Sequence, residues 1–252
     1  MAFAGVVLAA GLGTRLRPLT NLLPKALCPV NNEALLDRAL TQVGAYADDL
    51  AVNAHAHAEA IVGHVGDRAY VSVEPELLGT AGALGQLSAH LDGRDVLLAN
   101  CDAWRTGDLG LLVAGWDGMR PRLLCADVGE AADFGDLRYA GACLLPWAAV
   151  RDLPAEPSGL YEQVWRPAYE RAELDLVTTP ETFIDCGTPA EYLRANLVAS
   201  GGQSVVGPGA EVHGQLVRSV VWPGGYVGPD ERLVDSIRAG RDVTVRASPV
   251  AR

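Results

Sequence analysis

The first hundred residues alternate between short apolar runs and longer stretches in which apolar residues recur every three to four positions. An uninterrupted apolar run is typical of a strand buried on both faces of a parallel sheet, whereas the longer spacing is typical of a helix. Strands are predicted at residues 4–10, 50–53, 69–73 and 96–100, and helices at residues 31–46, 56–65 and 80–91. This alternation predicts right-handed βαβ units and therefore an α/β fold with a doubly wound, Rossmann-like mixed sheet.

The pattern is less regular after residue 120. Strands are predicted at residues 121–126, 139–145 and 183–184, and helices at residues 162–173, with a break near Pro167, and 189–200. Residues 201–204 are small and polar, which is typical of a linker. We therefore expect a first domain over residues 1–200 and a second over residues 204–252.

A six-residue period marks the chain beyond this linker. The residues that carry it are Val221, Val227, Leu233, Ala239 and Val245, with glycine and proline between them. A period of six predicts a short left-handed parallel β-helix of hexapeptide repeats, in which each flat side contributes one inward residue. An irregular β tail is the alternative interpretation.

Charge and composition narrow the range of functions. The formal net charge of −11 argues against a nucleic-acid partner, because its phosphates would be repelled. No apolar run approaches the roughly 18 residues that a membrane-spanning helix needs. The first residues lack the basic region of a signal peptide, so we expect a strand there. The five cysteines form no CxxC pair, which indicates reduced thiols in a cytoplasmic protein.

Lys25 is the only lysine in the chain, and all the other residues counted among the 20 Lys and Arg are arginines. A bias toward arginine is typical of a GC-rich genome, but it does not explain why one lysine remains at this position. A compact ammonium group differs chemically from a planar guanidinium group. Two explanations for this single lysine remain open. Lysine is retained at position 25 either by chance or because the chemistry at this position requires it.

A glycine-rich turn at Gly11 and Gly13 follows the first predicted strand, where backbone amides can approach phosphate oxygens. Its spacing matches neither the dinucleotide fingerprint nor the Walker A loop. The longer strings are LAAGLGTRLRPLT from Leu8, PKALCPV from Pro24, ELLGTAG from Glu76, LANCD from Leu98 and FIDCGTP from Phe183. Together they resemble the signature of the sugar-phosphate nucleotidyltransferases, or NDP-sugar pyrophosphorylases, and are similar to mannose-1-phosphate guanylyltransferases.

The resemblance implies that a sugar phosphate oxygen attacks the α-phosphorus of a nucleoside triphosphate and that pyrophosphate leaves. Such a reaction brings anions together, so cations and a metal must hold them. Arg15 is expected to hold the β- and γ-phosphates, and Lys25 to lie between the attacking phosphate and the α-phosphate. Asp102 and Asp185 are expected to hold Mg²⁺. The other expected nucleotide contacts are Leu8, Ala10, Gly11, Gly13, Thr14, Glu74, Gly79 and Thr80.

The base and the sugar are less defined. A carboxylate at Glu74 would accept hydrogen bonds from both N1 and N2 of guanine, which favours GTP, although uridylyl- and thymidylyl-transferring relatives have similar loops. Many relatives hold the sugar phosphate with a second lysine, which this chain lacks, and Arg138 is the nearest cationic substitute. Asn100, Gly141 and Glu162 are the other expected sugar contacts. Mannose 1-phosphate or a heptose 1-phosphate is the expected acceptor.

Two other classes of function remain open at this point. A non-catalytic, nucleotide-sugar-binding regulatory subunit would share the fold, and the missing second lysine favours it. An acyltransferase would share the six-residue period, although the repeats here are few for a complete acyl-CoA site. We do not expect zinc at His55, His57 and His64, because the matching stretch in the family packs against the sheet without metal. The expected partners are a nucleoside triphosphate, a sugar 1-phosphate and, through the C-terminal coil, a second copy of the chain.

Overall fold

The computed structural model describes residues 3–247, and the chain forms two compact units. One unit combines the chain up to Gly11 with Arg38–Phe183. The other combines Leu12–Asp37 with the chain from Ile184 onward. Each unit is therefore built from two separate stretches of sequence. Within residues 3–247, no helix is long and apolar enough to cross a membrane.

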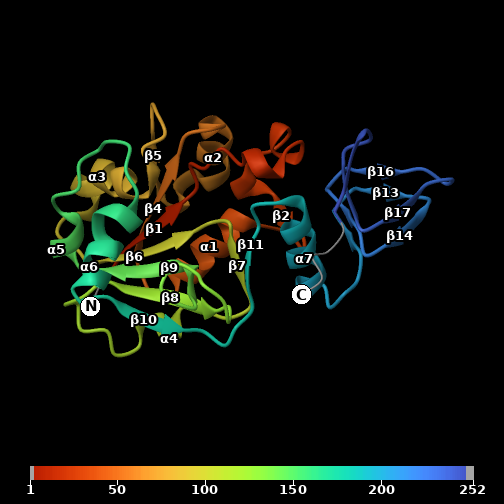
Figure 1. The fold of residues 1–252 in the computed structure, drawn as a ribbon. Helices are drawn as coiled ribbons and strands as arrows, with labels where there is room; N and C mark the ends of the chain where they lie inside the picture. The colour runs from red at the N-terminus through yellow and green to blue at the C-terminus, as the bar shows by residue number, and fades with distance from the viewer. Residues whose placement is uncertain (1–2, 248–252) are drawn as a thin grey trace. The chain divides into compact units, whose positions relative to one another are not determined.

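The first unit contains one large mixed sheet, coloured red to green-blue in Figure 1. Its strands are β1 (Ala4–Leu8), β4 (Asp49–Ala54), β5 (Tyr70–Val73), β6 (Val96–Asn100), β8 (Arg122–Asp127), β9 (Leu137–Leu145) and β10 (Asp175–Thr178). In the described part of the chain the strand order is β10-β8-β9-β6-β1-β4-β5. Strands β6, β1, β4 and β5 are parallel, β9 is antiparallel to β6 and β8, and β10 is parallel to β8. The predicted α/β fold with a mixed sheet is confirmed.

Short helices connect and cover these strands. They are α1 (Leu35–Gly44), within which the chain enters the first unit, α2 (Ala58–Val65), α3 (Gly79–Leu91), α4 (Gly110–Val113), α5 (Trp147–Val150) and α6 (Arg166–Glu170). The short strand β7 (Ala103–Arg105) follows β6. The helix expected at residues 162–173 is not broken at Pro167. A π-helical turn, Tyr161–Trp165, continues into α6, whose first turn contains the proline.

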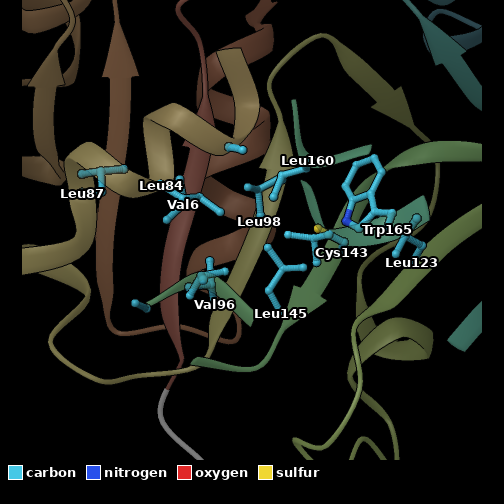
Figure 2. Close-up of a cluster of buried hydrophobic side chains, with 14 of the residues drawn as sticks. Val6, Leu84, Leu87, Val96, Leu98, Leu123, Cys143, Leu145, Leu160 and Trp165 are labelled. Atoms are coloured by element: carbon cyan, nitrogen blue, oxygen red, sulfur yellow. The ribbon is translucent and has the colours of Figure 1, made fainter. Parts of the chain in front are cut away.

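The core of the first unit lies between the sheet and α3. Val6, Leu98 and Cys143 occupy matching positions on β1, β6 and β9, and all three are fully buried. Figure 2 shows Leu84 and Leu87 of α3 beside Val6, with Leu160 and Trp165 toward the β9 end of the cluster. Burial of side chains of this size stabilises the fold by about 1.5–3 kcal/mol each. This layer holds the carboxyl ends of the parallel strands in fixed positions.

The second unit begins with 3-10 turns and ends with short strands. Its first segment contains the turns Thr14–Leu16, Leu19–Asn21 and Lys25–Leu27 and the antiparallel pair β2 (Pro29–Val30) and β3 (Glu33–Ala34). Its second segment begins within β11 (Phe183–Asp185) and continues with helix α7 (Pro189–Ala199). The strands that follow are β12 (Val205–Val206), β13 (Glu211–Val212), β14 (Gln215–Val217), β15 (Val220–Val221), β16 (Tyr226–Val227), β17 (Arg232–Val234), β18 (Ser236–Ala239) and β19 (Val243–Arg246). Helix α7 begins at a Thr188 cap, whose hydroxyl accepts a hydrogen bond from the Glu191 amide.

The C-terminal strands stack in parallel along three short sides. β12 pairs with β15 and β15 with β18, β13 pairs with β16, and β14 pairs with β17. Val221, Val227 and Leu233, three members of the six-residue period, pack together in one buried cluster. Strand β19 then turns back antiparallel to β18, and Val245 is only partly buried. The period therefore marks a core inside stacked coils, while their left-handed winding stays a prediction.

Tyr192 joins the early and late segments of the second unit. Its hydroxyl donates a hydrogen bond to the carbonyl of Pro29 and accepts one from Nε1 of Trp222 at 3.0 Å. Burial raises the pKa of Tyr192 well above its ordinary value, so the hydroxyl keeps its proton. The expected boundary near residue 200 therefore does not coincide with the compact units, because α7 and Leu12–Asp37 belong with the C-terminal strands. Residues 248–252 of the expected second domain lie outside the described residues.

We expect Tyr192→Phe to destabilise the protein by about 2–3 kcal/mol, because it leaves the Pro29 carbonyl and the Trp222 indole without their shared partner. Trp222→Phe should cost more through lost packing. Tyr169→Phe, at a residue that is about half exposed, is the control and should cost less than about 0.5 kcal/mol. Urea unfolding measures all three, and equal free energies of unfolding for wild type and Tyr192→Phe would contradict this role.

Candidate functional site

The glycine-rich turn is held in shape by its own side-chain contacts. Gly13 adopts a left-handed conformation with φ of 61°, and its carbonyl accepts a hydrogen bond from the Thr20 hydroxyl at 2.9 Å. A Cβ atom at Gly13 would lie 2.8 Å from Cγ2 of Thr20 and 3.1 Å from Cβ of Lys25. Glycine is therefore required at Gly13 both for the backbone angle and for space. The close approach packs the start of the turn Thr14–Leu16 against Lys25.

Three of the predicted catalytic and metal residues meet in the second unit. A carboxylate oxygen of Asp185 lies 3.5 Å from Nη2 of Arg15, and the other lies 3.7 Å from Nζ of Lys25. Gly187 leaves room for this cluster, since a Cβ there would lie 2.7 Å from Nη2 of Arg15 and 2.9 Å from Asp185. We call Arg15, Lys25 and Asp185 the cation cluster.

Arg15 and Lys25 differ in their exposure. The side chain of Arg15 is 67% exposed and that of Asp185 50%, whereas that of Lys25 is 9% exposed. The Arg15–Asp185 pair is exposed and contributes little to stability, so folding alone does not explain the position of Arg15. Two cations of different kinds at one place, one exposed and one buried, suit a ligand with several negative charges.

The cysteine next to this cluster is buried. Burial raises the pKa of Cys28 to about 12, while the nearby charge of Lys25 acts in the opposite direction. All five cysteines are buried as free thiols, and burial also raises the pKa values of Cys125 and Cys143 to about 12. A thiol with such a pKa stays protonated near neutral pH and is a poor nucleophile. The chemistry of the site therefore depends on its charged groups.

The other predicted nucleotide contacts lie in two segments of the first unit, apart from Gly13 and Thr14 in the second unit. Leu8, Ala10 and Gly11 lie at the carboxyl end of β1, and Gly79 and Thr80 begin α3. Three glycines of α3 face the segment 153–158, where a Cβ on Gly79, Gly82 or Gly85 would lie 2.1–2.5 Å from a backbone oxygen. The Thr80 hydroxyl accepts a hydrogen bond from the Leu160 amide at 2.8 Å. These three glycines therefore allow the backbone of residues 153–158 to pack closely against α3.

Glu74 has partners that the sequence did not predict. It is 3% exposed, and its two carboxylate oxygens accept hydrogen bonds from Nδ2 of Asn53 at 2.7 Å and from the Leu78 amide at 3.0 Å. Oδ1 of Asn53 in turn accepts a hydrogen bond from the Ala9 amide at 2.7 Å. Both oxygens of the carboxylate that is expected to face the base therefore already accept a hydrogen bond within the protein. Asn53 was missed, although a polar residue inside a buried strand is a recognisable signal.

The predicted sugar contacts occupy separate places in the first unit. Asn100 ends β6, and Asp102 follows in a turn where both are partly buried. Gly141 has φ of 74°, and a Cβ there would lie 2.1 Å from Cβ of Ala103, so glycine lets β7 approach. Arg138 pairs with Ala126 across β8 and β9, and Glu162 lies on the π-helical turn. These positions by themselves assign no role to Arg138 or Glu162.

Arg105 is a buried cation that the sequence analysis did not single out. It is 3% exposed and donates hydrogen bonds to Oε1 of Gln42 and to the carbonyl of Ala140, both at 2.9 Å. Burial lowers the pKa of Arg105 to about 10. The hydrogen bond to the Ala140 carbonyl attaches β7 to the backbone directly before Gly141. Arg105 is therefore a structural support behind the expected sugar contact.

Comparisons with known proteins define the class. Residues 5–127 match the family model described as a MobA-like NTP transferase domain. N-acetylmuramate alpha-1-phosphate uridylyltransferase of Caulobacter vibrioides is 35% identical over 147 residues, which cover 52% of this chain and 61% of the relative. The chain spans less than two thirds of the length of this relative. The predicted resemblance to sugar-phosphate nucleotidyltransferases is confirmed.

Solved structures with the same fold extend further along the chain. The structure titled mannose-1-phosphate geranyltransferase from Thermus thermophilus covers 97% of this chain, and the match covers 94% of that structure, at a TM-score of 0.73 and 16% identity. HddC from Yersinia pseudotuberculosis, complexed with GMP-PN, covers 78% of this chain, and the match covers 99% of that structure, at a TM-score of 0.63 and 19% identity. At these identities the likeness concerns the fold.

We expect Gly13→Ala to destabilise the protein by about 1–2 kcal/mol, because alanine meets Thr20 and is strained at a positive φ. Gly11→Ala is the matched control, since a Cβ at Gly11 would have nothing within 4 Å. Denaturant unfolding of the two variants measures the difference. Equal loss of stability in both would contradict the packing described for Gly13.

Proposed function

We propose that this protein transfers a nucleotidyl group from a nucleoside triphosphate to a sugar 1-phosphate. An oxygen of the sugar phosphate forms a bond to the α-phosphorus, and the bond from the α-phosphorus to the bridging oxygen breaks. Pyrophosphate leaves with that electron pair, and the product is an NDP-sugar. The observation that carries the proposal is the cation cluster, in which Arg15 and Lys25 share the Asp185 carboxylate.

The cation cluster suits this reaction because the nucleophile is already an anion. No general base is needed, and the main barrier is repulsion between phosphates. Arg15, exposed and planar, is suited to bind the β- and γ-phosphates of the leaving group through two oxygens. Lys25 is largely buried, so its ammonium group is a fixed point charge for the attacking phosphate and the α-phosphate. Binding of these anions would replace the carboxylate as partner of both cations.

The residues present also fit a divalent metal. In residues 3–247 no group of three or more His, Cys, Asp or Glu side chains is arranged to hold a metal. Mg²⁺ needs only one or two carboxylates, because phosphate oxygens and water complete its shell. Asp185, half exposed, and Asp102, partly buried, supply such oxygens. Mg²⁺ held by these carboxylates would neutralise charge on the phosphates and orient them.

The base is proposed to be a pyrimidine, with guanine as the second candidate. The relative that is 35% identical is a uridylyltransferase, and the oxygens of Glu74 that would select guanine already accept two hydrogen bonds. Guanine is favoured by the acceptor-only chemistry of Glu74 at the expected base position. We expect UTP to give the highest rate of pyrophosphate release when NTPs are screened against sugar 1-phosphates. Highest activity with GTP would select the second candidate.

The sugar site is proposed at Asn100 and Gly141, with Arg138 and Glu162 as further contacts. Mannose and heptose 1-phosphates remain the first acceptors to test, beside N-acetylmuramate 1-phosphate, the substrate named for the relative. We also propose that the C-terminal coils wind as a left-handed β-helix that joins copies of the chain, in a cytoplasmic enzyme. The pairing of Val205 with Val220 and of Gln215 with Arg232 suits coils with three short sides.

We expect Lys25→Arg to lower kcat by about 10²-fold or more while the melting temperature stays near that of wild type. The planar guanidinium is larger than the compact ammonium group and does not reproduce its point charge beside Asp185. Arg166→Lys, at an exposed ion pair with Glu170, is the control and should leave turnover unchanged. Pyrophosphate release measures the rates. Wild-type turnover in Lys25→Arg would remove the proposed role of Lys25.

We expect EDTA to abolish turnover and added Mg²⁺ to restore it. Asp185→Asn should raise the Mg²⁺ concentration needed for half-maximal rate by about tenfold or more, because an amide is a weaker ligand than a carboxylate. The change should affect stability by less than about 1 kcal/mol, since Asp185 is half exposed. Full activity in EDTA would refute the proposed metal.

A further inference from the structure

A buried chain of hydrogen bonds connects the two segments of the first unit that are expected to contact the nucleotide. It runs from the Ala9 amide to Oδ1 of Asn53 at 2.7 Å, and from Nδ2 of Asn53 to Oε1 of Glu74 at 2.7 Å. It ends where the Leu78 amide donates to Oε2 of Glu74 at 3.0 Å. Asn53 is 4% exposed and Glu74 3% exposed. We call this chain the Asn53–Glu74 relay.

The direction of every bond in the relay is fixed. The Ala9 amide can only donate, so the carbonyl oxygen of the Asn53 side chain must face it, and the Asn53 amide nitrogen must face Glu74. The Leu78 amide can also only donate, so it requires an acceptor at Glu74. Within the described residues the Glu74 carboxylate has hydrogen-bond donors instead of a cation as partners. The start of α3 adds support, because the positive end of a helix dipole favours an anion.

The relay is attached directly beside the expected nucleotide contacts. Ala9 lies between Leu8 and Ala10 at the end of β1, and Leu78 immediately precedes Gly79 and Thr80. A shift of either anchor therefore moves residues that are expected to contact the nucleotide. Displacements of about 1 Å in such positions can change rates by about 10²-fold. Burial of an anion for shape alone would be costly, since an apolar pair could fill the same space.

We propose that Asn53 and Glu74 are positioning residues that set the separation of the two nucleotide-facing segments and thereby the choice of base. Glu74 acts through Leu78 and Asn53, and does not contact the base itself. The proposal rests on the proposed function, because the two segments are defined by their expected contacts with the nucleotide. It replaces direct recognition of the base by Glu74 with control of the separation of these two segments.

An exchange of the two side-chain groups tests the relay. In Asn53→Asp two carboxylates face each other, and in Glu74→Gln the amide has to satisfy both the Leu78 donor and the Asn53 donor. In the double variant N53D/E74Q the middle hydrogen bond reverses. The carboxylate now at position 53 accepts from the Ala9 amide and from the side-chain amide nitrogen now at position 74. The side-chain oxygen at position 74 accepts from the Leu78 amide. All bonds of the relay are then restored with the same number of atoms and the same total charge.

We expect each single variant to raise the KM for the preferred NTP by about tenfold, the equivalent of one lost buried hydrogen bond, and to relax base choice, with a smaller effect on kcat. The double variant should return KM and base choice to within about threefold of wild type. Glu59→Gln, at an exposed position of α2, removes one negative charge as Glu74→Gln does. This control should leave KM, kcat and base choice unchanged. Thermal melting of all variants is measured in parallel.

Two results would overturn the relay. If the double variant keeps the altered base choice of Glu74→Gln, the carboxylate contacts the base directly. If the single variants lower the melting temperature but leave KM and base choice unchanged, the relay serves folding only. Should a single variant fail to fold, the double variant decides alone by the same criteria. If wild type shows no turnover, calorimetric NTP binding to the same variants tests the relay separately from the proposed function.

Discussion

The two ion pairs that Asp185 forms with Arg15 and Lys25 are the interactions on which the candidate site depends. The Asp185 carboxylate holds two cations at one place while leaving one of them exposed and the other nearly buried. Gly13 and Gly187 make this arrangement sterically possible, because a side chain at either position would collide with the cluster or with its support. The hydrogen bonds of Tyr192 to Pro29 and Trp222 connect the segment after Lys25 to helix α7 and to the C-terminal strands. The exposed Arg15–Asp185 pair contributes little to stability.

Much of the fold could be predicted from the sequence because the central strands β1 and β6 are buried on both faces. Strands β1, β4, β5 and β6 and helices α2 and α3 lie within two residues of their predicted limits, since each has a strong period of its own. The helix expected from residue 31 instead begins at Leu35, because Asn31 and Asn32 have φ of 49° and 68° and connect β2 to β3. Asparagine adopts a positive φ more readily than most residues, so two adjacent asparagines suit the central positions of a two-residue hairpin turn. The antiparallel β9 and the edge strand β10 depend on pairing between distant segments, which periodicity does not report.

Some residues of the candidate site could likewise be predicted from the sequence, and others could not. The residue types of Arg15, Lys25 and Asp185 could be predicted because motifs preserve charged groups at fixed spacing, and the structure brings these three together. The partners of Glu74 could not be predicted, because they come from β4 and from the start of α3, 21 and 4 positions away. Arg105 carries no motif, and its importance comes only from its burial and its contacts with Gln42 and Ala140. Long-range polar contacts of this kind are specified by tertiary packing, and single-sequence patterns do not contain them.

A label on the α-phosphorus of the substrate follows nucleotidyl transfer directly. Wild-type protein is incubated with Mg²⁺, a sugar 1-phosphate and an NTP that carries a radioactive label at the α-phosphate. We expect the label to appear in an NDP-sugar, with one pyrophosphate released for each product molecule and none without the sugar phosphate. Label recovered only in nucleoside monophosphate, or retained in intact NTP with every sugar 1-phosphate tested, would contradict nucleotidyl transfer.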